Sequence, residues 1–126
     1  MKTKLVNQKH DWDCYIACLA MYLDSPYGEI LEAYHHLIDK KYYNGITDKQ
    51  ASDLLKIAGV KPVIKSKLIH GVKGIVTVPS LNTEGFHVIY FDGKRFYDPN
   101  HSVEGKKFYR QNVKHVISML IDKDDL

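Results

Sequence analysis

The spacing of apolar residues changes halfway along the chain, and this change constrains the fold more than any other feature. In the first half, apolar residues recur at the spacing of one helix face. The clearest set follows the i, i+3, i+4, i+7, i+8 pattern: Cys14, Ala17, Cys18, Met21 and Tyr22. The second half has short strand-like runs separated by turn residues. Helices followed by strands predict an α+β domain, with N-terminal helices packed on a C-terminal antiparallel sheet.

Residues that cap or break helices mark three predicted helices. The first begins near Cys14, where Asp11 or Asp13 can cap it, and ends at residues 24–26, because the residue before a proline avoids the helical region. The second is predicted over about residues 27–40 and is broken at residues 44–45. Its inward face holds five residues: Ile30, Leu31, Tyr34, Leu37 and Ile38.

The third predicted helix has the clearest start signal. Residues 47–50 form a capping box, with Thr at the cap and Gln three positions later. The helix is expected to continue to about Ala58 and to close at Gly59, because glycine readily takes the left-handed conformation that ends a helix.

Four strands are predicted in the second half, over residues 60–67, 74–79, 86–91 and 95–98. The pair Asp92-Gly93 separates the last two and is a strong signal for a two-residue hairpin turn. Near the C-terminus, residues 113–121 return to helical spacing, which favours a short helix, and a strand is the alternative.

Length and composition bound the class of protein. The 126 residues suffice for one domain, predicted over residues 1–126, and 44% of them are apolar. No run approaches the roughly 18–20 apolar residues of a membrane span, and the charged N-terminus lacks the apolar core of a secretory signal. These features predict a cytoplasmic protein with no membrane partner, in which both cysteines are free thiols.

The charge pattern disfavours nucleic acid as a partner. The net charge is +3, but the chain has 16 scattered lysines and only two arginines, Arg95 and Arg110, whereas nucleic-acid readers rely on arginine. A weakly bound acidic or nucleic-acid partner remains an alternative. A zinc site at Cys14 and Cys18 is a further alternative, although a CxxxC on one helix lacks the CxxC spacing of structural zinc. No metal or cofactor is therefore predicted, and the sequence predicts no oligomeric state.

Cys14 is the residue on which the functional prediction depends. It lies in the first turn of its predicted helix, where unpaired N–H groups and the helix dipole favour a thiolate. Cys18 lies one turn deeper, where that effect has faded, so it is expected to pack. The alternative for either cysteine is the role of a small buried apolar residue.

The predicted hairpin supplies a base for such a thiol. With Asp92-Gly93 as the loop, His87 faces Asp98, and directly opposed residues have Cβ atoms about 4.5–5.5 Å apart. The carboxylate can hold one imidazole nitrogen and leave the other free to act as a base. If the loop is instead residues 93–94, His87 faces Asn100, whose amide can also orient the ring.

Two stretches resemble the bacteriocin-processing, double-glycine-leader peptidases, a papain-like cysteine peptidase family. One is Gln8, five further residues and Asp13-Cys14, followed by the sequence Ala-Cys-Leu-Ala-Met at residues 17–21. The other runs from residue 85 to residue 90 and resumes at residues 97–99, with a His that opens a strand and an Asp-Pro pair that closes the next.

The resemblance implies a papain-like fold and a cysteine-dependent reaction. It assigns Cys14 as nucleophile, His87 as general base and acid, Asp98 as orienter and Gln8 as oxyanion donor. On the residues alone, Gln8 could also be an ordinary solvated residue. The implied reaction is cleavage of a peptide or isopeptide bond in a peptide or protein substrate, or a related acyl transfer, through a thioester.

The sequence departs from this family directly after the nucleophile, where Tyr15 replaces the usual glycine. A ring there is expected to reshape the cleft, so a preference for double glycine is not carried over. Trp12 and Tyr15 flank the thiol and either line a substrate groove or staple the start of the helix. The alternative function is a catalytically silent papain-like module that binds a peptide in the same groove.

Overall fold

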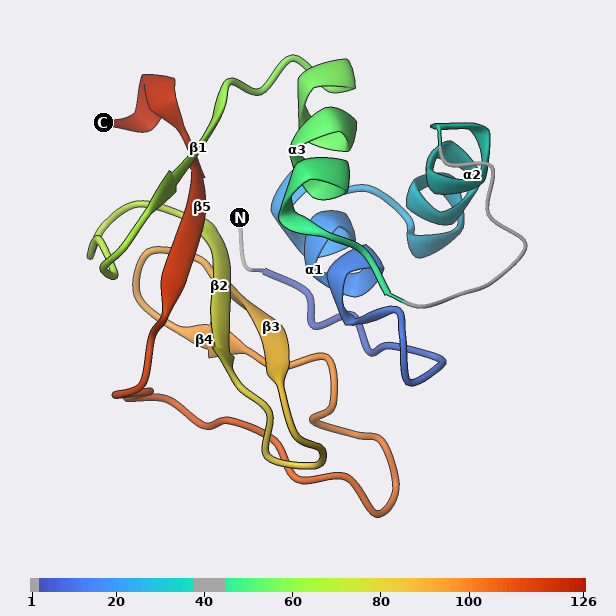
Figure 1. Cartoon of the computed structure of the whole chain (residues 1–126), viewed down its shortest axis with the longest axis vertical. Helices are drawn as coiled ribbons and strands as arrows, with labels where there is room; N and C mark the ends of the chain where they lie inside the picture. Colours follow the sequence, from blue (N-terminus) through green and yellow to red (C-terminus); the bar gives the residue numbers. More distant parts are fainter. Residues whose placement is uncertain (1–2, 38–44) are drawn as a thin grey trace.

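The computed structural model describes residues 3–37 and 45–126. Helices precede strands along this part of the chain, which confirms the predicted α+β class (Figure 1). The helices are α1 (Cys14–Leu23), α2 (Tyr27–Leu37) and α3 (Asp48–Ile57). The strands are β1 (Pro62–Lys65), β2 (Gly74–Pro79), β3 (Phe86–Phe91), β4 (Phe96–Tyr97) and β5 (Ser118–Asp122), and a 3-10 turn, η1 (Lys123–Asp125), follows β5.

The helix starts lie where the sequence places them. The predicted capping box of α3 is present: the Thr47 side chain accepts a hydrogen bond from the Gln50 amide (3.2 Å), and the Gln50 side chain accepts one from the Thr47 amide (3.0 Å). Asp13 occupies the cap position of α1, but its side chain makes no capping hydrogen bond. The Asp13 carboxylate is therefore free to bind elsewhere.

Helix α2 buries a narrower face than predicted. Ile30 and Tyr34 are buried as expected, but Leu37 is 41% exposed, which contradicts its inward placement. Leu37 is the last residue of α2 and lies one turn beyond Tyr34, where the helix no longer packs on the core. The predicted inward position of Ile38, the extension to residue 40 and the break at residue 44 lie outside the described residues.

The strands form a five-stranded sheet in the order β1-β5-β2-β3-β4, with antiparallel neighbours throughout. The favoured helix near the C-terminus is wrong, and the strand alternative is right. Strand β5 is an interior strand and pairs with both β1 and β2. Met119 and Ile121 are buried on one face of the sheet and Leu120 on the other. Consecutive apolar residues of β5 therefore pack into two different hydrophobic cores.

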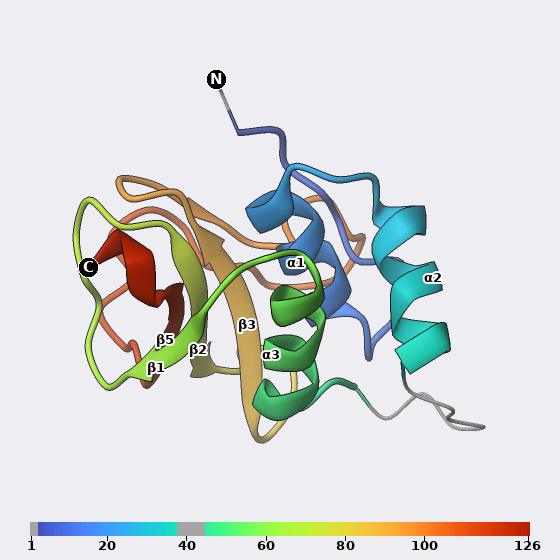
Figure 2. The same cartoon turned by 90° about the horizontal axis from the view of Figure 1, so that it is seen from above.

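The helices lie together on one face of the sheet (Figure 2). The first core fills the space between these layers and includes Ile16 and Leu19 of α1 and Val88 of β3. On the opposite face, no helix of the described residues contributes to the second core, and mostly loop residues pack against it. We call residues 98–117, which connect β4 to β5 and supply part of this cover, the strap.

The β3–β4 hairpin has the second of the two predicted registers. Phe91 pairs with Phe96, so the two-residue loop is Gly93-Lys94, and the register with Asp92-Gly93 as the loop is wrong. Gly93 has φ +105°, which a glycine adopts at no steric cost at the first central position of such a turn. Pairing stops at Tyr97, so the chain is free to change direction at Asp98.

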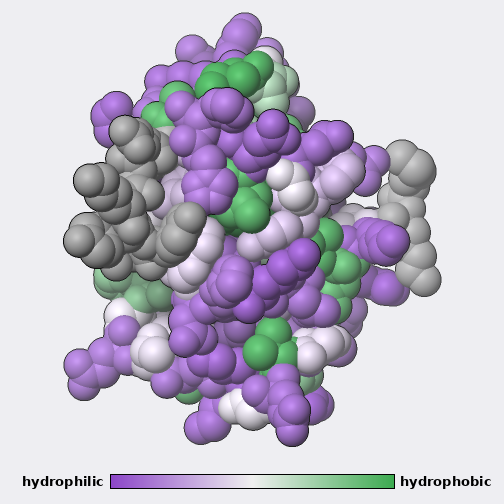
Figure 3. Space-filling view, turned by 90° about the vertical axis from the view of Figure 1, so that its right-hand side faces the viewer, coloured by the Kyte–Doolittle hydropathy of each residue, from purple (hydrophilic) through white to green (hydrophobic). Residues whose placement is uncertain are grey.

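Both cysteines are free thiols, as expected. Among the described residues, no helix has the length and apolar character needed to cross a bilayer. On the face shown in Figure 3, hydrophobic areas are small and are separated by hydrophilic residues.

Candidate active site

The two cysteines of α1 have different surroundings. Cys14 is the first residue of α1 and is partly exposed, close to the unpaired N–H groups of a helix start. Cys18, one turn later, is fully buried, and burial raises the pKa of its thiol well above the usual range. The environment therefore keeps Cys18 neutral and packed, and leaves Cys14 as the accessible thiol.

His87, the second residue of β3, is held by a carboxylate. Its Nε2 lies 2.8 Å from Oδ1 of Asp98. Asp98 is itself fixed, because its Oδ1 also accepts a hydrogen bond from the Asn100 amide (2.9 Å) and its Oδ2 accepts one from the Tyr109 amide (2.6 Å). Three donors thus orient one buried carboxylate, and Nδ1 of His87 remains for another partner.

If the register continued beyond Tyr97 it would oppose His87 to Asn100, yet Asp98 is the partner that reaches the ring. Strand β4 ends at Tyr97, and the chain then turns, with the His101 amide bonded to the Asp98 carbonyl (2.9 Å). This turn brings the Asp98 side chain to His87. The Asn100 side chain is buried, and its Oδ1 has no hydrogen-bond partner in the described part of the chain.

The structure brings Cys14 to the same imidazole. Burial lowers the pKa of His87, but its interactions with Asp98 and Cys14 outweigh burial and raise the pKa from 6.5 to about 9. The ring is therefore a cation at neutral pH. A thiol beside an imidazolium can persist as a thiolate, which is the reactive form of cysteine.

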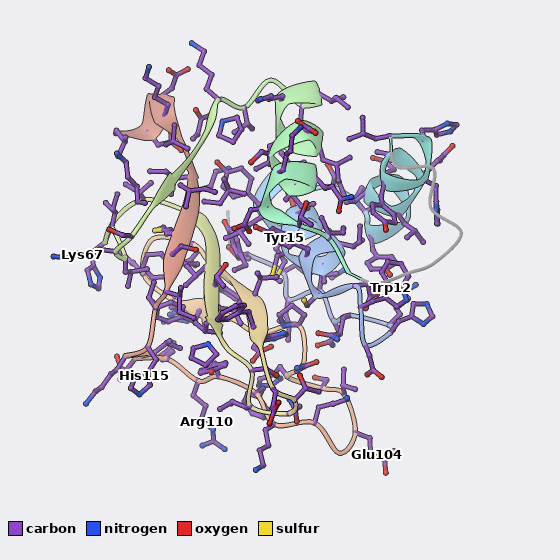
Figure 4. All side chains as sticks on the ribbon, in the orientation of Figure 1. Trp12, Tyr15, Lys67, Glu104, Arg110 and His115 are labelled. Carbon is purple, nitrogen blue, oxygen red and sulfur yellow. The ribbon has the colours of Figure 1, made fainter. Side chains whose placement is uncertain are left out.

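Cys14 and His87 line one open cleft of about 800 Å³, between the helical layer and the sheet. The predicted groove residues Trp12 and Tyr15 also line it, and Figure 4 shows both near the start of α1. Phe86, 74% exposed, stands beside His87 at the sheet side of the cleft. The cleft therefore offers aromatic surface next to the thiol and the imidazole.

Tyr15 lines the cleft and is also held by a second helix. It is only 4% exposed, and its hydroxyl donates a hydrogen bond to Oδ1 of Asp48 at the start of α3 (2.6 Å). Burial and the Asp48 carboxylate raise the Tyr15 pKa far above the usual range, so the hydroxyl stays a donor. The ring therefore ties α1 to α3 while one side of it forms cleft wall.

Gln8 is buried near the other predicted residues, but its amide is partly occupied. Its backbone N–H donates to the Pro99 carbonyl (3.1 Å), directly after Asp98. Its side-chain Nε2 donates to the His10 carbonyl (2.7 Å), and its Oε1 has no hydrogen-bond partner within residues 3–37 and 45–126. One N–H of Nε2 thus remains available, and Gln8 is outside the set that lines the cleft.

Asp13, predicted as a possible helix cap and part of the Asp13-Cys14 pair, has another role in the structure. Its side chain is fully buried and accepts hydrogen bonds from the amides of Lys9 and His10, each at 2.8 Å, and from the Tyr27 hydroxyl. It thereby orders the loop that carries Gln8 and leaves the first N–H groups of α1 uncapped. Its position directly before Cys14 was the sequence signal for such a role.

A metal site needs several ligating side chains in one place. In the described ranges, no group of three or more His, Cys, Asp or Glu side chains gathers in this way. The zinc alternative thus gains no support from the geometry.

Comparisons with known proteins bear on the fold. No family model matches the sequence, and no curated protein matches it. Among solved structures, the chain is similar to the peptidase domain of Streptococcus ComA, a bi-functional ABC transporter involved in a quorum-sensing pathway. The TM-score is 0.58 at 20% identity, over 97% of this chain and 100% of that chain. The chain thus has the papain-like peptidase fold that the sequence resemblance implied, and an identity this low carries the fold alone.

Proposed function

We propose that the chain is a cysteine-dependent peptidase, or a related acyl-transfer enzyme, that acts on a peptide or isopeptide bond. One observation carries the proposal: Cys14 at the start of α1 lines the same cleft as His87, whose ring Asp98 holds at 2.8 Å. In this proposal residues 1–126 act as one catalytic domain. The substrate is a peptide or protein, and the free thiols fit a reducing, cytoplasmic setting.

In the first step, the Cys14 sulfur attacks the carbonyl carbon of the scissile bond, and the π electrons move onto the carbonyl oxygen. The backbone N–H of Cys14 and the remaining side-chain N–H of Gln8 stabilise this oxyanion. The carbon–nitrogen bond then breaks, and protonated His87 gives its proton to the departing amine. The product of this half-reaction is a thioester on Cys14.

In the second step, His87 is neutral and acts as a base. It takes a proton from water, whose oxygen attacks the thioester carbon and displaces the Cys14 sulfur. The carboxylic acid leaves, and the thiolate–imidazolium pair is restored. An amine in place of water gives acyl transfer with the same proton movements. Asp98 holds the ring orientation through both steps and stays ionised.

A catalytically silent module that binds a peptide in the same cleft is the second candidate. Two observations favour it: the Gln8 side chain already donates to the His10 carbonyl, and Tyr15 replaces the glycine usual in the resembling family. In such a module the cleft and its aromatic walls would serve recognition, and Cys14→Ser would leave binding intact.

Selective alkylation distinguishes an activated thiol from a silent one. At pH 6.5, iodoacetamide should modify Cys14 at least tenfold faster in the wild type than in His87→Ala, because the imidazolium no longer supports the thiolate. Peptide mapping by mass spectrometry measures this rate, and buried Cys18 is the internal control. Equal Cys14 rates in the two proteins would contradict the ion pair.

Substrate cleavage is tested by exposing a cell extract to the protein and identifying new peptide termini by mass spectrometry. Wild type should generate termini that Cys14→Ala does not. A bell-shaped dependence of rate on pH is expected, because the reaction needs the thiolate together with a protonated His87. Identical terminus lists for the two proteins, together with an activated thiol, would leave the peptidase proposal without support and favour the binding module.

A further inference from the structure

A second cavity, separate from the cleft of Cys14, gathers both arginines of the chain. It has a volume of about 560 Å³, and Arg95, next to β4, and Arg110, on the strap, both line it. Figure 4 shows Arg110 at the lower end of the molecule. The chain has 16 lysines and only two arginines, yet no lysine lines this cavity. We call it the arginine cavity.

The two guanidinium groups have no anionic partner of their own. Within the described residues, neither forms an ion pair or a side-chain hydrogen bond. Asp92 is the acidic group that interacts with Arg95 at longer range, but its carboxylate already accepts hydrogen bonds from the Lys94 and Arg95 amides and from the Tyr97 hydroxyl. The guanidinium donors are therefore available to a ligand.

Aromatic rings form the walls between the arginines. Phe96, Tyr97, Phe108 and Tyr109 line the cavity, and the Arg110 guanidinium lies 5.5 Å from the centre of the Phe108 ring. Stacking on an aromatic face leaves the edge of a guanidinium open for hydrogen bonds. The walls thus provide flat apolar surface beside two exposed cationic groups, of which Arg110 stacks on a ring.

The acidic residue in the wall does not cancel this charge. Asp98 is 2% exposed, and its two oxygens accept hydrogen bonds from His87 and from the amides of Asn100 and Tyr109. An anion that enters the cavity therefore meets cationic groups and aromatic surface, and the wall carboxylate is already occupied.

We propose that the arginine cavity binds an oxyanion carried on a flat aromatic body. Guanidinium groups bind phosphate and carboxylate oxygens in a forked geometry, and aromatic walls accept a stacked ring. The volume lies within the range of small-molecule sites, roughly 300–1,000 Å³. An aryl phosphate, including a mononucleotide, and an aryl carboxylate share this chemistry. The inference does not depend on catalysis by Cys14.

Calorimetric titration of the Cys14→Ala protein tests the site apart from any reaction. The probes are phenyl phosphate, adenosine monophosphate, benzoate, inorganic phosphate and neutral phenol. Phenyl phosphate should bind saturably with a dissociation constant below about 1 mM, at least tenfold more tightly than inorganic phosphate or phenol. The ratio of phenyl phosphate to benzoate affinity separates the phosphate source from the carboxylate source. No binding of any aryl anion at millimolar concentration would overturn the proposal.

Matched charge removals locate the binding. Arg95→Gln and Arg110→Gln should each weaken phenyl phosphate at least tenfold, because each removes one forked donor. Lys94→Gln and Lys107→Gln remove the same charge from neighbouring positions outside the cavity and should change affinity less than twofold. Phe108→Leu should weaken phenyl phosphate and leave inorganic phosphate unchanged. Equal losses in the lysine and arginine variants would show general charge attraction and overturn the site.

Discussion

At the residue scale, the state of His87 decides what Cys14 can do. Two partners raise the pKa of the ring against the effect of burial, and one of them is the thiol itself. The predicted residues His87 and Asp98 meet even though the strand register, if it continued beyond Tyr97, would oppose His87 to Asn100. The contact depends on a single carboxylate, which three donors hold in place.

Removing the thiol should lower the basicity of the ring. In Cys14→Ser, the pKa of His87 should fall from about 9 by roughly 1 or more, because the interaction with the Cys14 sulfur that helps to raise it is lost. An NMR titration of the His87 ring protons measures this value. Cys18→Ala, one turn deeper in α1, is the control and should leave it in place. An unchanged value in Cys14→Ser would show that the thiol does not interact with the ring.

The raised pKa also makes folding stability depend on pH. Because the folded pKa of His87 is about 9 and the unfolded one about 6.5, the folded state holds the proton more tightly. The difference in pKa stabilises the folded state by up to roughly 3 kcal/mol. This stabilisation is fully present below pH 6.5 and is lost as pH rises through 9. Urea unfolding at pH 6 and pH 9.5 measures it. In His87→Gln, the free energy of unfolding should fall much less between these two pH values than in the wild type. An equal fall in the two proteins would assign the pH dependence to other groups.

Sequence reasoning predicted Cys14, His87 and Asp98 as candidate site residues, because the chemistry of a thiol, an imidazole and a carboxylate is specific to residue type. It did not find how Asp13 is used. A buried carboxylate that binds two amides upstream of it and the hydroxyl of Tyr27 depends on how the N-terminal loop folds back, and local spacing does not encode that path. For the same reason the position of Gln8, which donates hydrogen bonds to the carbonyls of His10 and Pro99, was not predictable.

At the element scale, the elements with strong local signals were predicted correctly. One segment with a weak helical signal forms a strand instead, because it pairs in the sheet. The bounds of β2 and β3 match the predicted ranges, and the capping box of α3 is present. The segment of β5 has helical spacing, but partners on both sides satisfy its backbone as a strand. Spacing along one segment does not report such long-range pairing, so tertiary context decided the outcome.

Gly74, at the start of β2, is the position where close packing excludes a side chain. An added Cβ would lie 2.7 Å from the backbone oxygen of Leu120 in β5. Gly74→Ala should therefore destabilise the fold by about 1–3 kcal/mol, because two paired strands must separate. Gly28→Ala is the matched control, because nothing lies within 4 Å of an added Cβ at this position. The substitution should stabilise the fold by about 0.5 kcal/mol, since alanine favours the helix α2 more than glycine does. Thermal unfolding compares both, and equal stability of the two variants would contradict this packing.

At the scale of the whole molecule, the candidate site forms only when distant parts meet. The thiol comes from the helical layer, the imidazole from the sheet and the orienting carboxylate from the start of the strap. The strap supplies the Tyr109 amide that binds Asp98, and residues of the strap also cover the second core. The path of the strap was not predictable, because the contacts that position it join residues far apart in sequence, and its last residues, 113–117, lie in the segment for which a helix was favoured.

Asn82, in the β2–β3 loop, holds the strap in place. Its side-chain amide donates to the Lys107 carbonyl and its carbonyl accepts from the Lys107 amide, each at 2.8 Å, as a strand neighbour would. Asn82→Ala should free the strap locally, so hydrogen-exchange protection of the Tyr109 amide should fall about tenfold, which corresponds to ~1.4 kcal/mol. Because that amide orients Asp98, Cys14 alkylation at pH 6.5 should slow with it.

Glu104→Gln is the control within the same strap. Glu104 is exposed, and Figure 4 shows it at the edge of the molecule, so its substitution should change neither protection nor alkylation. Hydrogen exchange also separates a local effect from general destabilisation. In Asn82→Ala, protection of the β2 and β5 amides should stay unchanged while that of the Tyr109 amide falls. Slower alkylation with full protection at Tyr109 would mean that Asn82 acts on the site by another route. Lost protection with unchanged alkylation would show that Asp98 keeps its orientation without the Tyr109 amide, since its bond to the Asn100 amide would then suffice.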